Sequence, residues 1–296
     1  MSALLQSRRL REVVHCMPEL TTEKLATYED WRLAHLLLVT ITSGYLWSGD
    51  PEEAPLILPR NLCTPLMAVS KRLGMPPVIC HGSACLANWN LIDPSEPFSP
   101  DNLRLNAFIF LESRANHWFF VVTAQIEKDF APCIYDIVRA TYFSKENSLQ
   151  YIENALHSIQ ESLTKATLTM KRLPEHLTPS EFFHQLRPFL LGYNEGSLKQ
   201  NGIIFEGDER KFLTEQREYM PREHRELIQW IEKESPVRKT AQGRQQALDA
   251  LLVFRSVHLN TVALYILTQI NGSATATGTG GTSFMKFLKK VKADTK

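Results

Sequence analysis

The sequence lacks several features that would assign it to a particular class of protein. Its 296 residues carry 33 Lys plus Arg against 32 Asp plus Glu, so no excess charge favours nucleic acid or an anionic membrane surface as a partner. The apolar run at 36–39 is far too short to span a bilayer, and residues 1–14 lack the apolar segment and cleavage site of a secretory leader. We therefore expect a cytoplasmic protein that acts on small molecules, without nucleic-acid or membrane partners.

Cysteine is scarce, and its spacing matches no common motif. The five cysteines occupy positions 16, 63, 80, 85 and 133, with no CxxC pair among them. An odd number without a leader predicts reduced thiols rather than a disulfide framework.

Familiar catalytic and nucleotide-binding motifs are also missing. No convincing pair of carboxylates or Ser/His/Asp arrangement occurs, so acid–base catalysis by side chains alone is not indicated. The glycine-rich stretch GTGGT at 278–282 lacks the lysine of a Walker loop and does not follow a strand, which makes nucleotide binding unexpected. Either a lid that closes on an anionic substrate or a simple hinge before a basic terminal helix would explain this stretch.

What the sequence does contain is helical periodicity over most of its length. Apolar residues at helical spacing predict helices over 22–47, 63–73, 82–91, 147–172 and 245–270, and a further helix from about 115 after a short strand or loop. The proline-rich stretch at 93–103 resembles a linker. We predict a mostly α protein with a small N-terminal, mainly helical domain, 1–110, and a large helical domain, 111–296.

The segment at 245–270 is the first candidate for a functional site. It is apolar on most of its circumference, which predicts a central position, yet Arg255 and His258 lie on one face with Leu251, Val262 and Tyr265. A neutral imidazole can take an axial position on haem iron while a guanidinium one turn away reaches a propionate. A hydrogen-bonded core histidine would give the same spacing, so the pattern leaves both interpretations open.

Two other segments carry polar groups in apolar surroundings. At 177–190, Thr178 and Glu181 form a capping box with Pro179 at the first helical position, and Arg187 precedes Pro188 at an expected kink or helix end. Such an arginine either forks onto a carboxylate in a cavity or lies exposed on the surface.

In the segment 75–89, small residues follow His81 and would let backbone approach a flat ligand. The imidazole would then be a distal hydrogen-bond donor or a second metal ligand, or alternatively an ordinary surface histidine.

These segments, in this order, resemble the indoleamine 2,3-dioxygenase family, haem enzymes that insert both atoms of O₂ across the indole C2–C3 bond of tryptophan. The resemblance runs from about residue 58 to the C-terminus. It rests on six ordered motifs: LPRNLCTPLMAVSKRLGMPP, ANW at 87–89, FF…LR at 182–187, YMPREHREL at 219–227, RSVHL at 255–259 and GTGGT at 278–282.

The resemblance implies haem b as cofactor, with His258 as the ligand of the iron and Arg255 as the propionate partner. It also implies L-tryptophan or a related indole and O₂ as substrates, and an unidentified reductant. A haem enzyme of specialised indole metabolism and a non-catalytic oxygen-binding protein on the same scaffold are the alternatives.

For the substrate side, the resemblance implies a set of pocket residues. Arg187 would clamp the substrate carboxylate, and Thr123 keeps a hydroxyl where the family has serine. The remaining residues assigned to the substrate pocket are Phe119, Phe182, Phe183, Thr279 and Gly280.

Two departures from the family concern the distal side. Family enzymes commonly carry tyrosine at the position of His81, so this histidine adds a new polar group, with altered O₂ handling or a six-coordinate resting state as the expected effect. Asp208 also runs directly into Glu209 where the family has a few dozen residues, and the stretch after Val237 is short.

Overall fold

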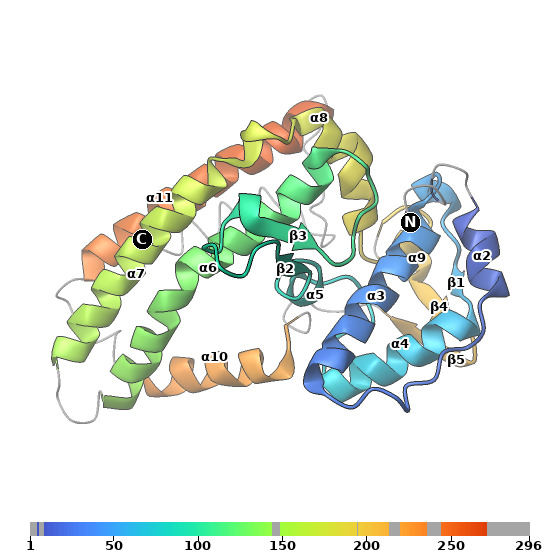
Figure 1. Ribbon diagram of the computed structural model, residues 1–296, viewed down its shortest axis with the longest axis horizontal. Coiled ribbons are helices and arrows are strands. Elements are labelled where there is room, and N and C mark those ends of the chain that lie inside the picture. The colour runs from blue at the N-terminus through green and yellow to red at the C-terminus, as the bar shows by residue number, and fades with distance from the viewer. Residues whose placement is uncertain are drawn as a thin grey trace.

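The computed structural model describes residues 5, 9–143, 149–193, 195–212, 220–235 and 244–270, which form a mostly helical protein (Figure 1). The α-helices are α2 (Leu10–Cys16), α3 (Tyr28–Trp47), α4 (Arg60–Leu73), α5 (His81–Ala84), α6 (Arg114–Phe143), α7 (Leu149–Met170), α8 (Pro179–Glu181), α9 (Leu198–Asn201), α10 (Arg222–Glu234) and α11 (Arg244–Tyr265). The strands are β1 (Ile57–Leu58), β2 (Trp89–Leu91), β3 (Leu103–Leu105), β4 (Ile203–Phe205) and β5 (Asp208–Phe212).

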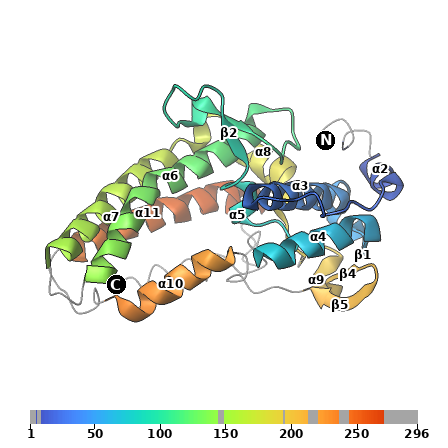
Figure 2. The ribbon, with the colours of Figure 1, turned by 60° about the horizontal axis from the view of Figure 1, so that its bottom comes forward.

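Three long helices form one elongated part of the molecule. α6, α7 and α11 lie side by side in both views, and α7 packs against each of the other two (Figures 1 and 2). α10 runs along one edge of the molecule and contacts α6, and none of its residues is buried. An apolar cavity lies between the three long helices.

The N-terminal helices pack beside a small sheet that connects distant parts of the chain. β1 pairs in parallel with β4, placing Ile57 opposite Ile204, and β4 pairs in antiparallel fashion with β5. β4 and β5 are joined by a tight turn at Glu206 and Gly207, where Gly207 has a φ of +87° that favours glycine. The Asp208–Glu209 junction thus lies within the continuous strand β5.

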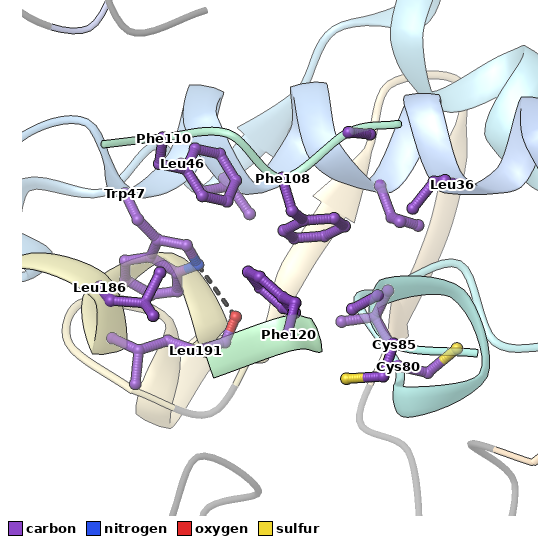
Figure 3. Close-up of a cluster of buried hydrophobic side chains, with 14 of the residues drawn as sticks. Leu36, Leu46, Trp47, Cys80, Cys85, Phe108, Phe110, Phe120, Leu186 and Leu191 are labelled. Atoms are coloured by element: carbon purple, nitrogen blue, oxygen red, sulfur yellow. Dashed lines mark hydrogen bonds between the residues drawn. The ribbon is translucent and has the colours of Figure 1, made fainter. Parts of the chain in front are cut away.

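A single buried cluster joins the N-terminal helices to the rest of the fold. In Figure 3, Leu46 and Trp47 of α3 face Phe120 of α6 and Leu191, and the Trp47 indole donates a hydrogen bond of 3.1 Å to the Leu191 carbonyl. Because this cluster includes residues on both sides of residue 110, the predicted division into two domains remains a prediction.

The longest predicted helices agree with the structure, and capping explains the differences at their ends. α7 covers nearly all of the predicted range 147–172. α3 begins only at Tyr28, not at 22, because the side chain of Thr27 accepts from the Asp30 amide and the Asp30 carboxylate accepts from the Thr27 amide.

The predicted helix over 82–91 is wrong. α5 has a single turn, His81–Ala84, and β2 then pairs with β3 in antiparallel register, Trp89 opposite Leu105. Pairing with the strand that follows the proline-rich stretch overrides the helical pattern, and the 3₁₀ turn Pro100–Asn102 shows that the end of the expected linker is ordered structure.

The central position predicted for the last helix is also wrong. Among the described side chains of α11, only Ala247 and Tyr265 are buried, although the helix packs against α7. By length and composition alone, Arg244–Gln269 could cross a membrane, a test that core helices of soluble proteins also pass. The surface left uncovered on α11 lines cavities instead.

Candidate functional site

A largely apolar cavity of about 550 Å³ lies between α5, α6, the segment leading to α8, and α11. Such a volume lies within the roughly 300–1,000 Å³ that is usual for cofactor and ligand sites. Its walls are formed by His81, Phe119, Thr123, Ile126, Glu127, Met170, Leu173, Leu177, Phe182, Leu190, Phe254, His258, Thr261, Val262, Tyr265 and Ile266.

His258 projects from α11 into this cavity without a hydrogen-bonded partner in the described part of the chain. Burial lowers the pKa of its imidazole, which keeps the ring neutral at physiological pH. A neutral imidazole with a free lone pair is the form that binds iron. Within the described ranges no three His, Cys, Asp or Glu side chains gather as in a metal site made of protein ligands alone. A neutral histidine of this kind suits an iron that brings its other ligands in a macrocycle, and the site fits haem.

Three aromatic rings, from α6, α11 and the turn after α8, line one part of the cavity. The ring centroids of Phe119 and Phe182 lie 5.2 Å apart, and Phe182 meets Tyr265 edge-on at 5.9 Å. The Tyr265 hydroxyl donates to the Leu177 carbonyl at 2.6 Å, while burial raises the pKa of Tyr265 to about 12, so it remains a neutral phenol. These rings supply flat apolar surface of the kind that contacts haem or an indole.

Local sequence explains how Phe182 reaches the cavity. The Thr178–Glu181 capping box, with Pro179 at the first helical position, starts α8 as predicted. The chain then continues through a π-helical turn, Phe182–Leu186, and a 3₁₀ turn from Arg187 to Leu190, so the expected kink lies at Arg187.

Polar groups of the cavity wall come from α5 and α6. The Nε2 atom of His81 lies 2.8 Å from Oε1 of Glu127. The Thr123 hydroxyl donates to the Phe119 carbonyl at 2.7 Å, so towards the cavity it can only accept a hydrogen bond.

The turn that carries His81 is held by a buried histidine of α3. His35 is fully buried, and its Nδ1 and Nε2 atoms lie 2.7 Å from the Ser83 hydroxyl and 3.0 Å from the Pro76 carbonyl. Since a carbonyl only accepts, Nε2 donates, and Nδ1 accepts from Ser83 in the neutral ring. Burial lowers the pKa of His35 to about 4, against a weaker opposing contribution from the Pro76 hydrogen bond.

The structure brings together half of the sequence-predicted site residues. The five that line the cavity are His81, Phe119, Thr123, Phe182 and His258. Glu127 also lines the cavity, and sequence reasoning missed it, because its partner His81 lies 46 positions away and neither residue belongs to a spaced motif.

The predicted arginines and the second phenylalanine lie outside the cavity wall. The Arg187 guanidinium lies over the Phe183 ring, 5.2 Å from its centroid, and burial lowers the pKa of Arg187 while Glu195 opposes that shift. Arg255 lies one turn before His258 on α11. Thr279 and Gly280 are outside the described residues, so their roles, like those of the arginines, stay predictions.

A second apolar cavity of about 460 Å³ adjoins the first. The two share Ile126, Glu127 and Phe254, and the second extends between α6, α7 and α11 as far as Arg244. No histidine lines it. The histidine-bearing cavity is therefore the candidate site, with further apolar space beside it.

A mostly helical fold with a neutral histidine in an apolar, aromatic cavity is the arrangement that helical haem proteins use to hold their cofactor. The family model described as "Indoleamine 2,3-dioxygenase" matches this chain over residues 1–211 and 207–296. The chain belongs to the indoleamine 2,3-dioxygenase family, whose members are haem dioxygenases and related haem proteins.

Three relatives illustrate the range of the family. Indoleamine 2,3-dioxygenase 1 of Mus musculus is 30% identical over 99% of this chain and 85% of its own length, and indoleamine 2,3-dioxygenase 2 of Homo sapiens is 28% identical over 99% and 85%. A myoglobin of Haliotis madaka is 28% identical over 99% of this chain and 88% of its own length.

The comparisons also bear on the short Asp208–Glu209 junction. The mouse alignment covers 348 positions, more than the 296 residues of this chain, so the relative has residues without a counterpart here. The two matched parts of the family model meet at 207–211, the beginning of β5. The two matches therefore divide at the place where the sequence departs from the family pattern.

Proposed function

We propose that this chain binds haem b through the His258 imidazole and cleaves the indole C2–C3 bond of tryptophan or a related indoleamine, giving an N-formylkynurenine-type product. The observation that carries the proposal is the neutral imidazole of His258, which lines an apolar cavity and has no hydrogen-bond partner among the described residues. The chain also belongs to a family of haem proteins. Both atoms of O₂ would enter the product, and a cytoplasmic reductant would keep the cofactor active.

Bound haem supplies the oxygen chemistry, and the chain contributes binding, orientation and exclusion of water. His258 holds the cofactor, with Arg255 as the proposed propionate partner. Phe119 and Phe182 would hold an indole ring and keep water out, while the Thr123 hydroxyl offers an acceptor for a substrate N–H. No side-chain acid–base pair is required.

Arg187 is the proposed partner of the substrate carboxylate. Its planar guanidinium can form two parallel hydrogen bonds to a carboxylate. Since the guanidinium lies over Phe183, this role requires the side chain to turn from that ring towards the cavity when substrate binds. The partly desolvated position would strengthen the pairing with an anionic substrate.

The proposal is tested by spectra and product analysis of reduced, haem-loaded protein with and without L-tryptophan. We expect a haem absorption band that changes on tryptophan addition, and N-formylkynurenine in the presence of O₂. His258→Ala should abolish the haem band, whereas His184→Ala, a histidine outside the cavity wall, should keep it. An unchanged visible spectrum in His258→Ala would contradict the assigned ligand.

Oxygen binding without catalysis is the second candidate function, favoured by the full-length similarity to a myoglobin. A stable oxygenated form that tryptophan leaves unchanged, with no indole turnover, would support it. A different oxidised indole found by mass spectrometry would instead indicate a specialised reaction on the same scaffold.

A further inference from the structure

His81 and Glu127 form a pair in the wall of the cavity that holds His258. His81 belongs to α5 and Glu127 to α6, and the distance from Nε2 to Oε1 is 2.8 Å. Their side chains are 47% and 45% exposed, and both residues line the cavity. A second histidine therefore faces the same space as the proposed iron ligand.

The backbone of the α5 turn is fixed by contacts on its other side. The Arg32 guanidinium of α3 donates to the Gly82 carbonyl, and Ser83 is hydrogen-bonded to the buried His35. The position of His81 is thus set by Arg32 and His35 of α3, and its ring orientation by Glu127.

Hydrogen-bond chemistry determines what this histidine can do. An ionised carboxylate only accepts, so the Nε2 atom that contacts Glu127 must carry a proton. A protonated ring nitrogen has no lone pair for a metal.

Two titratable neighbours raise the pKa of His81. Burial disfavours the imidazolium, but interactions with Cys85 and with Glu127 outweigh burial and raise the pKa of His81 to about 10. Cys80, on the same turn, and Arg32, on α3, are the other ionisable groups nearby.

We propose that Glu127 is a positioning residue that holds His81 as a hydrogen-bond donor in the cavity wall and so keeps this second imidazole off the haem iron. The inference rests on the proposed haem binding, and it decides between the two distal roles that the sequence leaves open for His81. Of the two histidines in the cavity, only His258 is then available to bind iron. The haem would keep a position free for a gaseous ligand.

The main test compares ferric, haem-loaded variants by absorption and electron paramagnetic resonance. Wild type should be high-spin. Glu127→Ala frees Nε2 and should give a low-spin form with two imidazole ligands, while Glu127→Ala/His81→Ala should return to high-spin. Glu127→Gln keeps an acceptor oxygen and should stay close to wild type, which a merely structural role for Glu127 would not predict.

A matched control exists on α7. Glu161 contacts the Nε2 atom of His157 at 3.3 Å in an exposed pair that lines neither of the two cavities. Glu161→Ala should therefore leave the spin state unchanged.

Azide binding to the ferric protein gives a quantitative measure. If His81 occupies the iron in nine of ten Glu127→Ala molecules, the apparent azide affinity falls roughly tenfold, because only the remaining fraction is competent to bind. The double variant should recover the affinity.

Three results would overturn the proposal: a low-spin wild type that His81→Ala converts to high-spin, an unchanged spectrum in Glu127→Ala, or a low-spin Glu127→Ala form that persists in the Glu127→Ala/His81→Ala double variant. Nitrogen NMR of the purified wild type provides a measurement that needs no Glu127 variant, since it should show a proton on Nε2 of His81 at neutral pH. An unprotonated Nε2 would contradict the proposed role of Glu127, whether or not the protein binds haem. Absence of haem binding would separately refute the proposed function.

Discussion

Replacing His35 by glutamine removes a buried imidazole whose protonation opposes folding. The unfolded chain takes up a proton on this side chain below about pH 6.5, whereas the folded protein resists protonation until about pH 4. The unfolded state thus binds more protons over this interval, so stability falls as the pH falls from about 6.5 to about 4 and levels off below that.

The magnitude follows from the two pKa values. Each tenfold difference in proton affinity is worth about 1.4 kcal/mol, so the full loss is about 3 kcal/mol, of which roughly 2 kcal/mol has occurred at pH 5. Glutamine can keep a donor towards the Pro76 carbonyl and an acceptor for Ser83, but it does not titrate.

The assay is urea unfolding of both proteins at about pH 7.5 and about pH 5. We expect wild type to lose about 2 kcal/mol more than His35→Gln between the two conditions. His224→Gln, which removes an exposed histidine of α10, serves as control and should behave like wild type. Equal losses in wild type and His35→Gln would refute the reasoning, because they would show that His35 titrates alike in the folded and unfolded states.

Two further predictions concern the segment that forms the aromatic wall. Phe182→Ala removes a buried ring that contacts Phe119 and Tyr265 and should lower the free energy of unfolding by about 3–5 kcal/mol, measured by urea titration; a loss below about 1 kcal/mol would show that the ring is not packed as described. Thr178→Ala removes the N-cap acceptor for the Glu181 amide and should cost about 1 kcal/mol, whereas Thr178→Ser should be nearly neutral in the same assay.

Sequence reasoning succeeded where the signal is local. The amphipathic pattern of α7 and the capping box at Thr178 depend on residues within one or two helical turns, and both appear in the structure. The family itself was also predictable, because ordered motifs around Arg187 and His258 are specific.

It failed where contacts between distant segments decide the conformation. The segment 82–91 becomes a single turn and a strand because β3 offers a pairing partner, which no helical pattern within the segment reveals. The apolar composition of α11 predicted a buried helix. Few other elements cover it in the structure, so most of its side chains are only partly buried.

The sequence by itself determined that this chain is mostly helical, that it belongs to a haem-dioxygenase family and that His258 lies on a long helix, since periodicity, caps and ordered motifs are properties of the linear chain. Only the tertiary structure decided that His81 faces the same cavity as His258 and that Glu127 holds it. The physical reason is that a hydrogen bond between side chains 46 positions apart exists only after α5 and α6 have packed together.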